Sequence, residues 1–451
     1  MGAATQTIAA IATPPGNGGV GILRLSGPEA ITILQRHVGV VPEPRVAGLR
    51  PFRDTQGDVI DTGLVVCFTA PNSFTGEHIA EFQGHGGAVL MDHLLELVCR
   101  SGARPARPGE FSERAFHHGK LDLAQAEAIA DVIAAGSRTA ARAATRSLQG
   151  EFSTRVNALI QDTVALRVYI EAAMDFPDED IDFLADGVVA DRLRGLQARL
   201  TQLRRCAGQG ALLQAGLNVA IIGRPNVGKS SLLNQLAGRP SAIVTDIPGT
   251  TRDVVREAVQ LGALPLHLMD TAGIRETQDP VEQEGVRRAK AALQQADHIF
   301  WVIDDTQQHD NLDRDLALLP NRTPTSLLLN KADLSGRPCG VVAGAGLPHP
   351  AYAISALSGA GLDAFADDLA QRVGLDHQGA DALSARRRHL LALDNAGQRI
   401  ASAMQPSKIA HAAELAAEDL RLAHDALGEI VGVMTSDELL GEIFASFCIG
   451  K

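Results

Sequence analysis

The chain has few cysteines and few aromatic residues. Aromatic side chains make up only 4% of it, so its cores must consist largely of Leu, Ile, Val and Ala. The five cysteines are odd in number, widely spaced and never in a CxxC pair. This pattern argues against a disulfide framework or a structural zinc site and favours a reducing, cytoplasmic setting. The cysteines are Cys67, Cys99, Cys206, Cys339 and Cys448.

Long hydrophobic segments are missing as well. No apolar run approaches the ~18 residues that a membrane span needs, and the first residues lack the basic and apolar pattern of a secretory signal. We therefore expect no membrane as a partner. The formal net charge of −12 opposes binding to nucleic acid, so an RNA substrate would require a local basic patch or a second protein.

Two short charged runs each have two interpretations. Asp175–Asp186 is strongly acidic and is either a solvated turn between helices or a metal site, and the solvated turn is favoured. Arg386–Arg388 is the densest basic run and is either a solvated helix start or a contact with RNA, and the solvated start is favoured.

The sequence changes texture along its 451 residues, a length that predicts two to four domains. Short β-like runs such as Val20–Leu25 and Leu64–Phe68 alternate with Gly and Pro near the start, which predicts an α+β domain. Later, apolar runs alternate with helical segments, as in a parallel sheet with crossover helices. The four predicted domains are 1–119 (α+β), 120–215 (helical, first part), 216–375 (α/β) and 376–451 (helical, second part). We predict a multidomain protein of α/β and α+β class, with the α/β domain inserted into a helical domain.

The first helix of the helical domain is predicted from its apolar spacing. Leu121, Leu123, Ile129, Val132 and Ile133 recur at intervals that place them on one helix face. We expect that face to be buried.

A phosphate-binding motif opens the α/β domain. Gly223–Ser230 fits the pattern G-x-x-x-x-G-K-[ST], after an apolar run at Leu217–Ile222 and before a helical segment at Ser231–Leu236. Glycines let backbone N–H groups point at phosphate oxygens, and the helix adds its positive end. We expect Lys229 to reach the β- and γ-phosphates and the Ser230 hydroxyl to bind Mg²⁺. The predicted contacts here are Asn226, Val227, Gly228, Lys229, Ser230 and Ser231.

Three further motifs follow apolar runs in the order found in GTPases. Asp270-Thr271-Ala272-Gly273 suits the magnesium shell and a loop that senses the γ-phosphate. In Asn330-Lys331-Ala332-Asp333, the carboxylate of Asp333 can accept hydrogen bonds from N1–H and the exocyclic amine of guanine, a donor pair that adenine lacks. Ser355-Ala356 can contact the base through backbone N–H. The four motifs together predict a P-loop GTPase.

The first switch is predicted at residues 245–253. We expect Thr251 to complete the Mg²⁺ shell, and the nucleotide contacts predicted in this loop are Thr245, Asp246, Ile247, Pro248, Gly249, Thr250 and Thr251. The position where Ras-like proteins carry a water-orienting Gln is Ile274, so hydrolysis needs another group. Glu282 is our candidate for positioning the water, through a bridging water; the alternative is an exposed residue in the first turn of a helix. Arg252 and Arg275 are weaker candidates for stabilising charge.

Motifs outside the α/β domain carry a resemblance to a known family. They lie at Thr13–Arg24, Pro71–Glu77, Gln83–Gly87, Arg107–Ser112 and Phe447–Lys451. With the inserted GTPase domain, the chain resembles the tRNA-modification GTPase family MnmE (TrmE), from near residue 7 to the last residue. The stretch 335–350 is the least similar to the family.

The resemblance implies a chemistry and partners. Such proteins act with an FAD-containing partner, MnmG (GidA), on C5 of the wobble uridine of certain tRNAs, and the FAD is on the partner. The one-carbon unit comes from a tetrahydrofolate derivative, either 5-formyl- or 5,10-methylene-tetrahydrofolate, bound by the N-terminal domain. The family forms a homodimer through its N-terminal domains, and potassium-dependent pairing of its G domains accelerates hydrolysis.

The resemblance also implies roles for single residues. The potassium ligands that carry over are Asn226, Thr245, Ile247 and Thr250. The folate contacts that carry over are Arg24, Glu81, Lys120 and Lys451, although Arg24 and Lys120 can equally be ordinary surface charges. Cys448 lies in a motif implicated in the modification chemistry, and a buried structural thiol is the alternative.

Two other functions share part of these motifs. A ribosome-assembly GTPase switch would carry the same nucleotide motifs, but such a factor more often has a basic RNA-binding domain. A folate-dependent one-carbon transferase with a regulatory GTPase would differ only in its acceptor.

Overall fold

The computed structural model describes residues 6–175, 187–238, 256–270, 293–307, 323–343, 349–375, 379–405, 413–433, 437–447 and 450. The chain divides into two compact units, each built from separate stretches of sequence. Unit 1 is 1–130, 148–182 and 410–451, and unit 2 is 131–147 and 183–409. This division is coarser than the four predicted domains, whose borders stay a prediction. Within the described ranges, no helix is long and apolar enough to cross a membrane.

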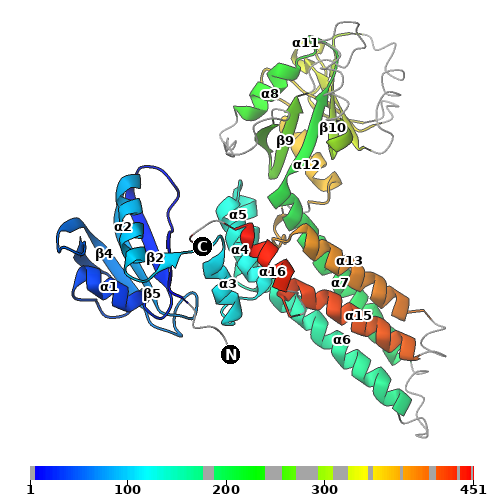
Figure 1. Ribbon diagram of the computed structural model, residues 1–451. Helices are drawn as coiled ribbons and strands as arrows, with labels where there is room; N and C mark the ends of the chain where they lie inside the picture. The colour runs from blue at the N-terminus through cyan, green and yellow to red at the C-terminus, as the bar shows by residue number, and fades with distance from the viewer. Residues whose placement is uncertain are drawn as a thin grey trace, which may run out of the picture. The chain divides into compact units, whose positions relative to one another are not determined.

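Unit 1 contains a six-stranded sheet near the N-terminus (Figure 1). Its order is β3 (Gly48–Arg53), β4 (Val59–Phe68), β5 (Ile79–Gly86), β2 (Gly18–Ser26), β1 (Ile8–Ile11) and β6 (Arg104–Pro105). The predicted β runs near residues 20 and 64 are confirmed in β2 and β4.

Alternation along the strands decides which side chains form the core of this sheet. Leu23 and Leu25 of β2 and Phe82 of β5 are fully buried with residues of α1 (Ala30–Val38) and α2 (Ala88–Arg100). Arg24 and Glu81 lie between these buried positions and therefore face the other side of the sheet.

A second group of helices belongs to unit 1. They are α3 (Glu110–His117), α6 (Glu151–Asp175), α15 (Ala413–Val431), α16 (Asp437–Ala445) and most of α4 (Leu123–Ala134). Figure 1 shows α15 beside α6 along much of its length. A small core joins Leu123 of α4 to Phe444 of α16 and Phe447.

The predicted buried face of the first helix is only partly correct. Leu123 is fully buried, but Ile133 is 47% exposed and Leu121 precedes the helix. The buried positions of α4 are mostly small or polar: Ala124, Ala126, Glu127, Ala128 and Asp131. The apolar spacing predicted the wrong buried face. Most of the side chains of α4 that pack against neighbouring segments are alanines and two acidic residues rather than large aliphatic residues.

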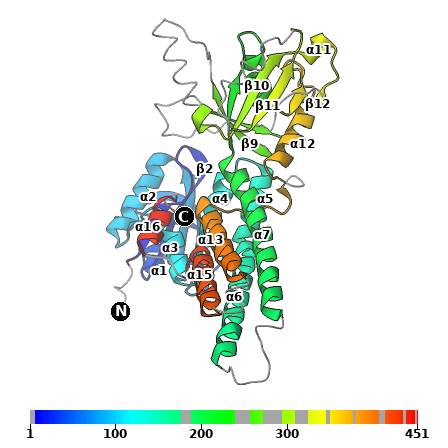
Figure 2. The same ribbon diagram turned by 90° about the vertical axis from the view of Figure 1, so that its right-hand side faces the viewer.

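Unit 2 contains helices on both sides of the α/β segment in sequence. α5 (Arg138–Leu148) and α7 (Val188–Ala215) precede it, and α13 (Arg387–Ala403) follows it. Figure 2 shows α13 running beside α7. An ion pair joins Arg204 Nε on α7 to Asp394 Oδ1 on α13 at 2.9 Å. Helical texture on both sides of the α/β segment is thus confirmed.

The α/β segment folds into a seven-stranded sheet (Figure 2). Its order is β12 (Gly340–Val342), β13 (Ala351–Ala353), β11 (Thr325–Asn330), β10 (His298–Asp304), β7 (Leu217–Ile222), β9 (Leu264–Asp270) and β8 (Arg256–Leu261). The five inner strands are parallel, and β8 and β12 pair antiparallel at the edges. The strands predicted from apolar runs before each nucleotide motif are confirmed.

Both faces of this sheet are covered. Val219 of β7 and Phe300 of β10 pack with α8 (Lys229–Ala237) and α12 (Leu362–Arg372), while Ala220 and Trp301 belong to a separate core on the opposite face. Burial on both faces explains why these strands read as continuous apolar runs.

Candidate functional site

The nucleotide motifs meet at one edge of the seven-stranded sheet. After β7 the chain forms β8 and β9 on one side of it and then crosses to β10 on the other side, which makes β7 a topological switch point. Ligands of open α/β sheets bind at the carboxyl ends of strands beside such a point. The phosphate loop follows β7, Asp270 ends β9, and the two base-recognition motifs follow β11 and β13.

The phosphate loop is held by its own lysine. Lys229 Nζ donates to the carbonyl oxygens of Gly223 at 2.8 Å and Arg224 at 2.9 Å, so the ammonium lies against the loop backbone. Gly228 has a φ of +98°, and a Cβ there would lie 2.2 Å from Asn330 Nδ2. The loop therefore requires glycine at this position both for its backbone conformation and for its contact with the next motif.

Asn330 connects the phosphate loop to the base-recognition loops. Its Nδ2 donates to the Val227 carbonyl at 2.8 Å, and its Oδ1 accepts from the Ala356 N–H, also at 2.8 Å. Asn330 is 2% exposed, and Val227 and Ala356 are also buried. Three motifs separated in sequence are thus joined through one buried amide.

Asp304 is a site residue that the sequence analysis missed. Its Oδ2 pairs with Lys331 Nζ at 2.7 Å, and its Oδ1 accepts from the Thr306 hydroxyl at 2.6 Å. Burial raises the pKa of Asp304, but the hydrogen bonds from Lys331 and Thr306 outweigh it and hold the pKa below its ordinary value. The available signal was an aspartate at the end of a wholly buried strand, β10.

The segment after the Asn-Lys-Ala-Asp motif is anchored as well. Asp333 lies exposed in α11 (Ala332–Ser335). Beyond it, Arg337 Nε donates to the buried carboxylate of Asp305 at 2.9 Å, and the Ser335 hydroxyl donates to the same carboxylate at 2.5 Å. These contacts fix the turn that follows Asp333. Ser355 is buried beside Ala356 at the end of β13.

Several predicted site residues lie outside the described ranges. They are Thr245, Asp246, Ile247, Pro248, Gly249, Thr250, Thr251, Arg252, Thr271, Ala272, Gly273, Ile274, Arg275, Glu282, Cys448 and Lys451. The acidic stretch is also outside them, apart from the backbone of Asp175 at the end of α6.

The predicted folate contacts Arg24 and Glu81 form an ion pair. They are register partners on β2 and β5, and Arg24 Nε lies 2.8 Å from Glu81 Oε1. Gln83 Nε2 donates to the other carboxylate oxygen at 3.0 Å, and the Arg24 guanidinium lies 5.9 Å from the centre of the Phe111 ring. An ionised carboxylate has about four acceptor positions, so Glu81 can still accept from a ligand.

The C-terminal segment of unit 1 reaches this pair. Arg24 Nη1 donates to the Gly450 carbonyl at 3.5 Å. Gly450 has a φ of +91°, and a Cβ there would lie 2.6 Å from the Ile11 carbonyl oxygen. This close approach places the residue before Lys451 against the sheet. Sequence analysis identified the two charged residues but missed Gln83, Phe111 and Gly450.

Lys120 is exposed and belongs to a different part of unit 1. Its Cε lies 3.4 Å from the position that a Cβ would take at Gly76, in the loop before β5. The structure does not bring it into the ion pair of Arg24 and Glu81.

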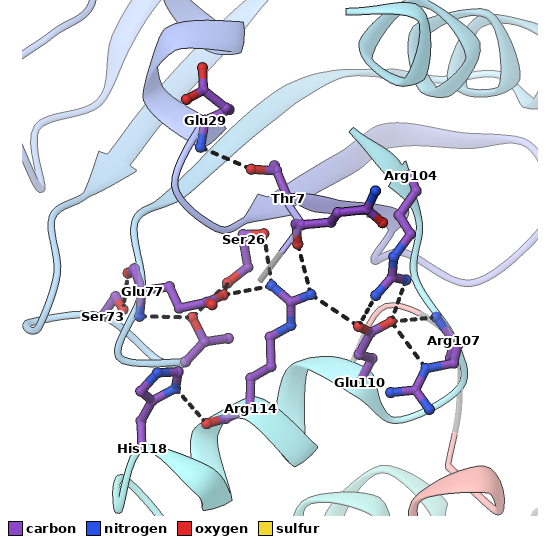
Figure 3. Close-up of polar contacts among 12 residues, drawn as sticks. Thr7, Ser26, Glu29, Ser73, Glu77, Arg104, Arg107, Glu110, Arg114 and His118 are labelled. Atoms are coloured by element: carbon purple, nitrogen blue, oxygen red, sulfur yellow. Dashed lines mark hydrogen bonds and ion pairs between the residues drawn. The ribbon is translucent and has the colours of Figure 1, made fainter. Parts of the chain in front are cut away.

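A buried ionic network ties α3 to the sheet of unit 1 (Figure 3). Arg114 pairs with Glu77 at 2.8 Å and Glu110 at 3.0 Å, and all three side chains are at most 10% exposed. Glu110 also pairs with Arg104 at 2.5 Å. Burial raises the pKa of Glu110, but hydrogen bonds from Arg104, the Arg107 N–H and Arg114 lower it to about 2. Arg114 Nη1 also donates to the carbonyl of Ser26 at 3.3 Å, so the network anchors α3 to the end of the strand that carries Arg24.

A phosphate loop at a switch point, joined to guanine-type motifs on the next parallel strands, defines a P-loop GTPase. A family model described as the MnmE helical domain matches residues 123–448, and one described as the GTP-binding protein TrmE N-terminus matches residues 7–120. The chain belongs to the tRNA modification GTPase family MnmE (TrmE). Because the helical match spans the GTPase segment, insertion of that segment into the helical sequence is confirmed.

Relatives match along the whole chain. The tRNA modification GTPase MnmE of Marinobacter nauticus is 51% identical over 456 residues, covering 100% of both chains. That of Proteus mirabilis is 49% identical over 453 residues, covering 99% of both. Among solved structures, Aquifex aeolicus Era bound to GDP.AlF4- is 27% identical over 41% of this chain and 66% of its own, with a TM-score of 0.27. Our fold assignment rests on the sheet order and the motifs.

Family membership establishes a GTP hydrolase that acts in tRNA modification and binds guanine nucleotide with Mg²⁺. It favours this role over the ribosome-assembly switch.

Proposed function

We propose that the chain is a potassium-activated GTP hydrolase that forms the 5-carboxymethylaminomethyl-type modification at the wobble uridine of certain tRNAs. It acts with an FAD-containing partner of the MnmG (GidA) type and with a tetrahydrofolate one-carbon unit. One observation carries the proposal: Arg24, Glu81 and the Gly450 carbonyl meet on the face of the N-terminal sheet opposite the core formed with α1 and α2. A GTPase alone would not need this convergence of two distant chain segments.

The chemistry of this cluster suits a folate. A pterin presents N–H donors that the Glu81 carboxylate can accept, and the glutamate tail is anionic and suits cationic side chains. In the proposal Arg24 and Lys451 supply cations at this cluster, Lys120 supplies another from its separate position in unit 1, and the ligand is 5-formyl- or 5,10-methylene-tetrahydrofolate. Cys448, next to this segment in sequence, is proposed to take part in the modification chemistry.

Calorimetric titration of the full-length protein with 5-formyltetrahydrofolate tests the folate site. The full chain is used because the proposed homodimer, held by the N-terminal domains, would complete the pocket. We expect saturable binding that weakens in Arg24→Gln and on deletion of Lys451. Arg50→Gln is the matched control, because Arg50 is a partly exposed arginine of β3 that donates to backbone carbonyls. An absence of binding by the unaltered protein would remove the folate chemistry from the proposal.

The proposed nucleotide site uses the residues named from sequence. Ser230 and Thr251 hold Mg²⁺; Asn226, Thr245, Ile247 and Thr250 hold K⁺. Asn226 lies exposed in the phosphate loop with a φ of +63°, a conformation that asparagine tolerates well. When bound, the two cations supply positive charge against the β- and γ-phosphates. Asp333 selects guanine, and Glu282 positions the attacking water.

The proposed switch has two further parts. Potassium-dependent pairing of the G domains across the homodimer accelerates hydrolysis, and this change of state regulates the modification. We place the protein in the cytoplasm, where the scattered free thiols would stay reduced.

A further inference from the structure

Two segments of unit 2 are basic in an otherwise acidic chain. Residues 132–147 contain three arginines, and residues 382–393 contain three arginines and His389. Neither segment contains an Asp or a Glu, although the whole chain has a formal net charge of −12. Such local concentration of one charge is the pattern expected where a polyanion binds.

The fold brings these two segments together. Arg146 Nη1 on α5 donates to the Ala380 carbonyl at 2.6 Å, and the Ser147 hydroxyl donates to the Ser384 carbonyl at 3.1 Å. The Ser384 N–H returns a bond to the Ala143 carbonyl at 3.4 Å. The end of α5 is therefore fixed against the chain that leads into α13.

The arginines of these segments fall into two groups. Arg386 pairs with the buried carboxylate of Asp131 at 3.1 Å, and Arg146 binds backbone carbonyls, so both have structural partners. Arg138, Arg142 and Arg387 are exposed, and no ion pair joins any of them to another residue of the described ranges. Arg138 and Arg142 are four residues apart on α5, which places them on one helix face.

We propose that Arg138, Arg142 and Arg387, here called the arginine surface, bind the phosphate backbone of RNA. The guanidinium group matches phosphate geometry with two parallel N–H donors, and groups without a protein partner are available to do so. The inference rests on the family's role in tRNA modification and adds the place where the tRNA backbone is held.

Composition decides between backbone and base contacts. Residues 132–150 and 379–393 contain no Phe, Tyr or Trp, so they offer no aromatic side chain on which a base could stack. We therefore assign the arginine surface to the phosphate backbone, which positions RNA without reading its sequence, and assign recognition of particular tRNAs to other residues. Asp381, immediately before the acid-free stretch 382–393, is the carboxylate nearest in sequence to Arg387, and it is also exposed.

Binding of tRNA at several KCl concentrations tests the arginine surface. The triple variant Arg138→Gln/Arg142→Gln/Arg387→Gln is compared with Arg100→Gln/Arg194→Gln/Arg421→Gln. The control removes equal charge from exposed arginines that pair with neighbouring acids. We expect the first variant to bind tRNA about tenfold or more weakly at low salt. A plot of log K against log salt has a negative slope. We expect this slope to become less steep by about 2 in the first variant, because each of the three lost phosphate contacts contributes ~0.7 to 0.9. GTP hydrolysis should stay unchanged in both.

Three outcomes would overturn the proposal. Equal losses in both variants would show a general effect of net charge, and no loss in either would show a merely solvated surface. Unchanged tRNA binding together with Arg-dependent binding of polyglutamate would indicate an acidic protein partner instead. If the unaltered protein binds tRNA and supports modification while the variant behaves like the control, only the arginine surface fails and the proposed function stands.

Discussion

The side-chain amide of Asn330 donates to the backbone carbonyl of Val227 at 2.8 Å, and this one bond joins the base-recognition loop to the phosphate loop. The other end of the same amide accepts from Ala356. Asn330 thus acts as a positioning residue that sets the distance between the pockets for the phosphates and for the base.

Replacing Asn330 with Ala should weaken nucleotide binding. The change leaves two buried backbone groups without partners, at a cost in stability of about 1–3 kcal/mol each. We expect about 1.4–2.8 kcal/mol of this to appear as weaker binding, so GDP affinity should fall by about 10- to 100-fold. Fluorescent GDP titration measures this. Asn218→Ala is the control, because the Asn218 amide bonds only to Asp297 in an exposed position. Unchanged affinity in Asn330→Ala would show that the two loops are held together by other contacts.

Glu282→Ala tests the proposed water-positioning group. We expect GTP affinity to be retained and hydrolysis to slow by at least about tenfold, because the water would lose its orienting acceptor. Rates are measured in KCl and in NaCl, and the unaltered protein should be faster in KCl. Glu284→Ala, two residues away in sequence, is the control and should hydrolyse GTP normally. A Glu282→Ala variant with normal turnover would contradict the assignment.

We expect His298 to make the GTPase segment sensitive to acid. It is 4% exposed at the start of β10, and its Nε2 lies 2.9 Å from the Ser326 hydroxyl oxygen. Burial, with a smaller contribution from the charge of Arg372, lowers the pKa of His298 to about 4 from 6.5. The unfolded chain therefore binds the proton more tightly than the folded chain does. The contribution of His298 to the free energy of unfolding is fully present above pH ~6.5. It is lost as the pH drops towards ~4, which lowers the free energy of unfolding by up to about 3 kcal/mol.

The single tryptophan provides the readout for His298. Trp301 lies on β10 and is 7% exposed, so its fluorescence reports unfolding of this sheet. Urea midpoints should fall between pH 7 and pH 4.5 in the unaltered protein and fall less in His298→Gln. Parallel pH curves for the two proteins would show that the acid sensitivity arises from other groups.

The buried network can be tested by comparing Arg114, which belongs to it, with the exposed Arg100. Each pairs with a glutamate four residues earlier, but Arg114 is 5% exposed and Arg100 is 72% exposed. We expect Arg114→Met to destabilise unit 1 by about 3–5 kcal/mol, because Glu77 and Glu110 would keep buried charges without their partner. Arg100→Met should cost less than about 1 kcal/mol. Hydrogen exchange of β2 and β5 measures both, and equal protection in the two variants would contradict the role of the network.

The strands and nucleotide loops could be predicted because parallel strands are continuous apolar runs and phosphate loops have fixed spacing. The buried face of α4 could not, because its core positions are alanines and the acidic residues Glu127 and Asp131. Asp304 and Gly450 were missed for another reason: their roles depend on partners that are distant in sequence. Lys331 follows Asp304 after 26 intervening residues, and Arg24 lies 426 positions before Gly450.

Nucleoside analysis of tRNA tests the central claim most directly. Total tRNA is isolated from a host lacking its own protein of this family and supplied with this chain or with its Arg24→Gln variant. The account predicts that the chain restores the 5-carboxymethylaminomethyl-type wobble uridine and that the variant, although folded and active on GTP, restores much less. Wobble uridines that remain unmodified when the intact chain is present with its flavoprotein partner would contradict it.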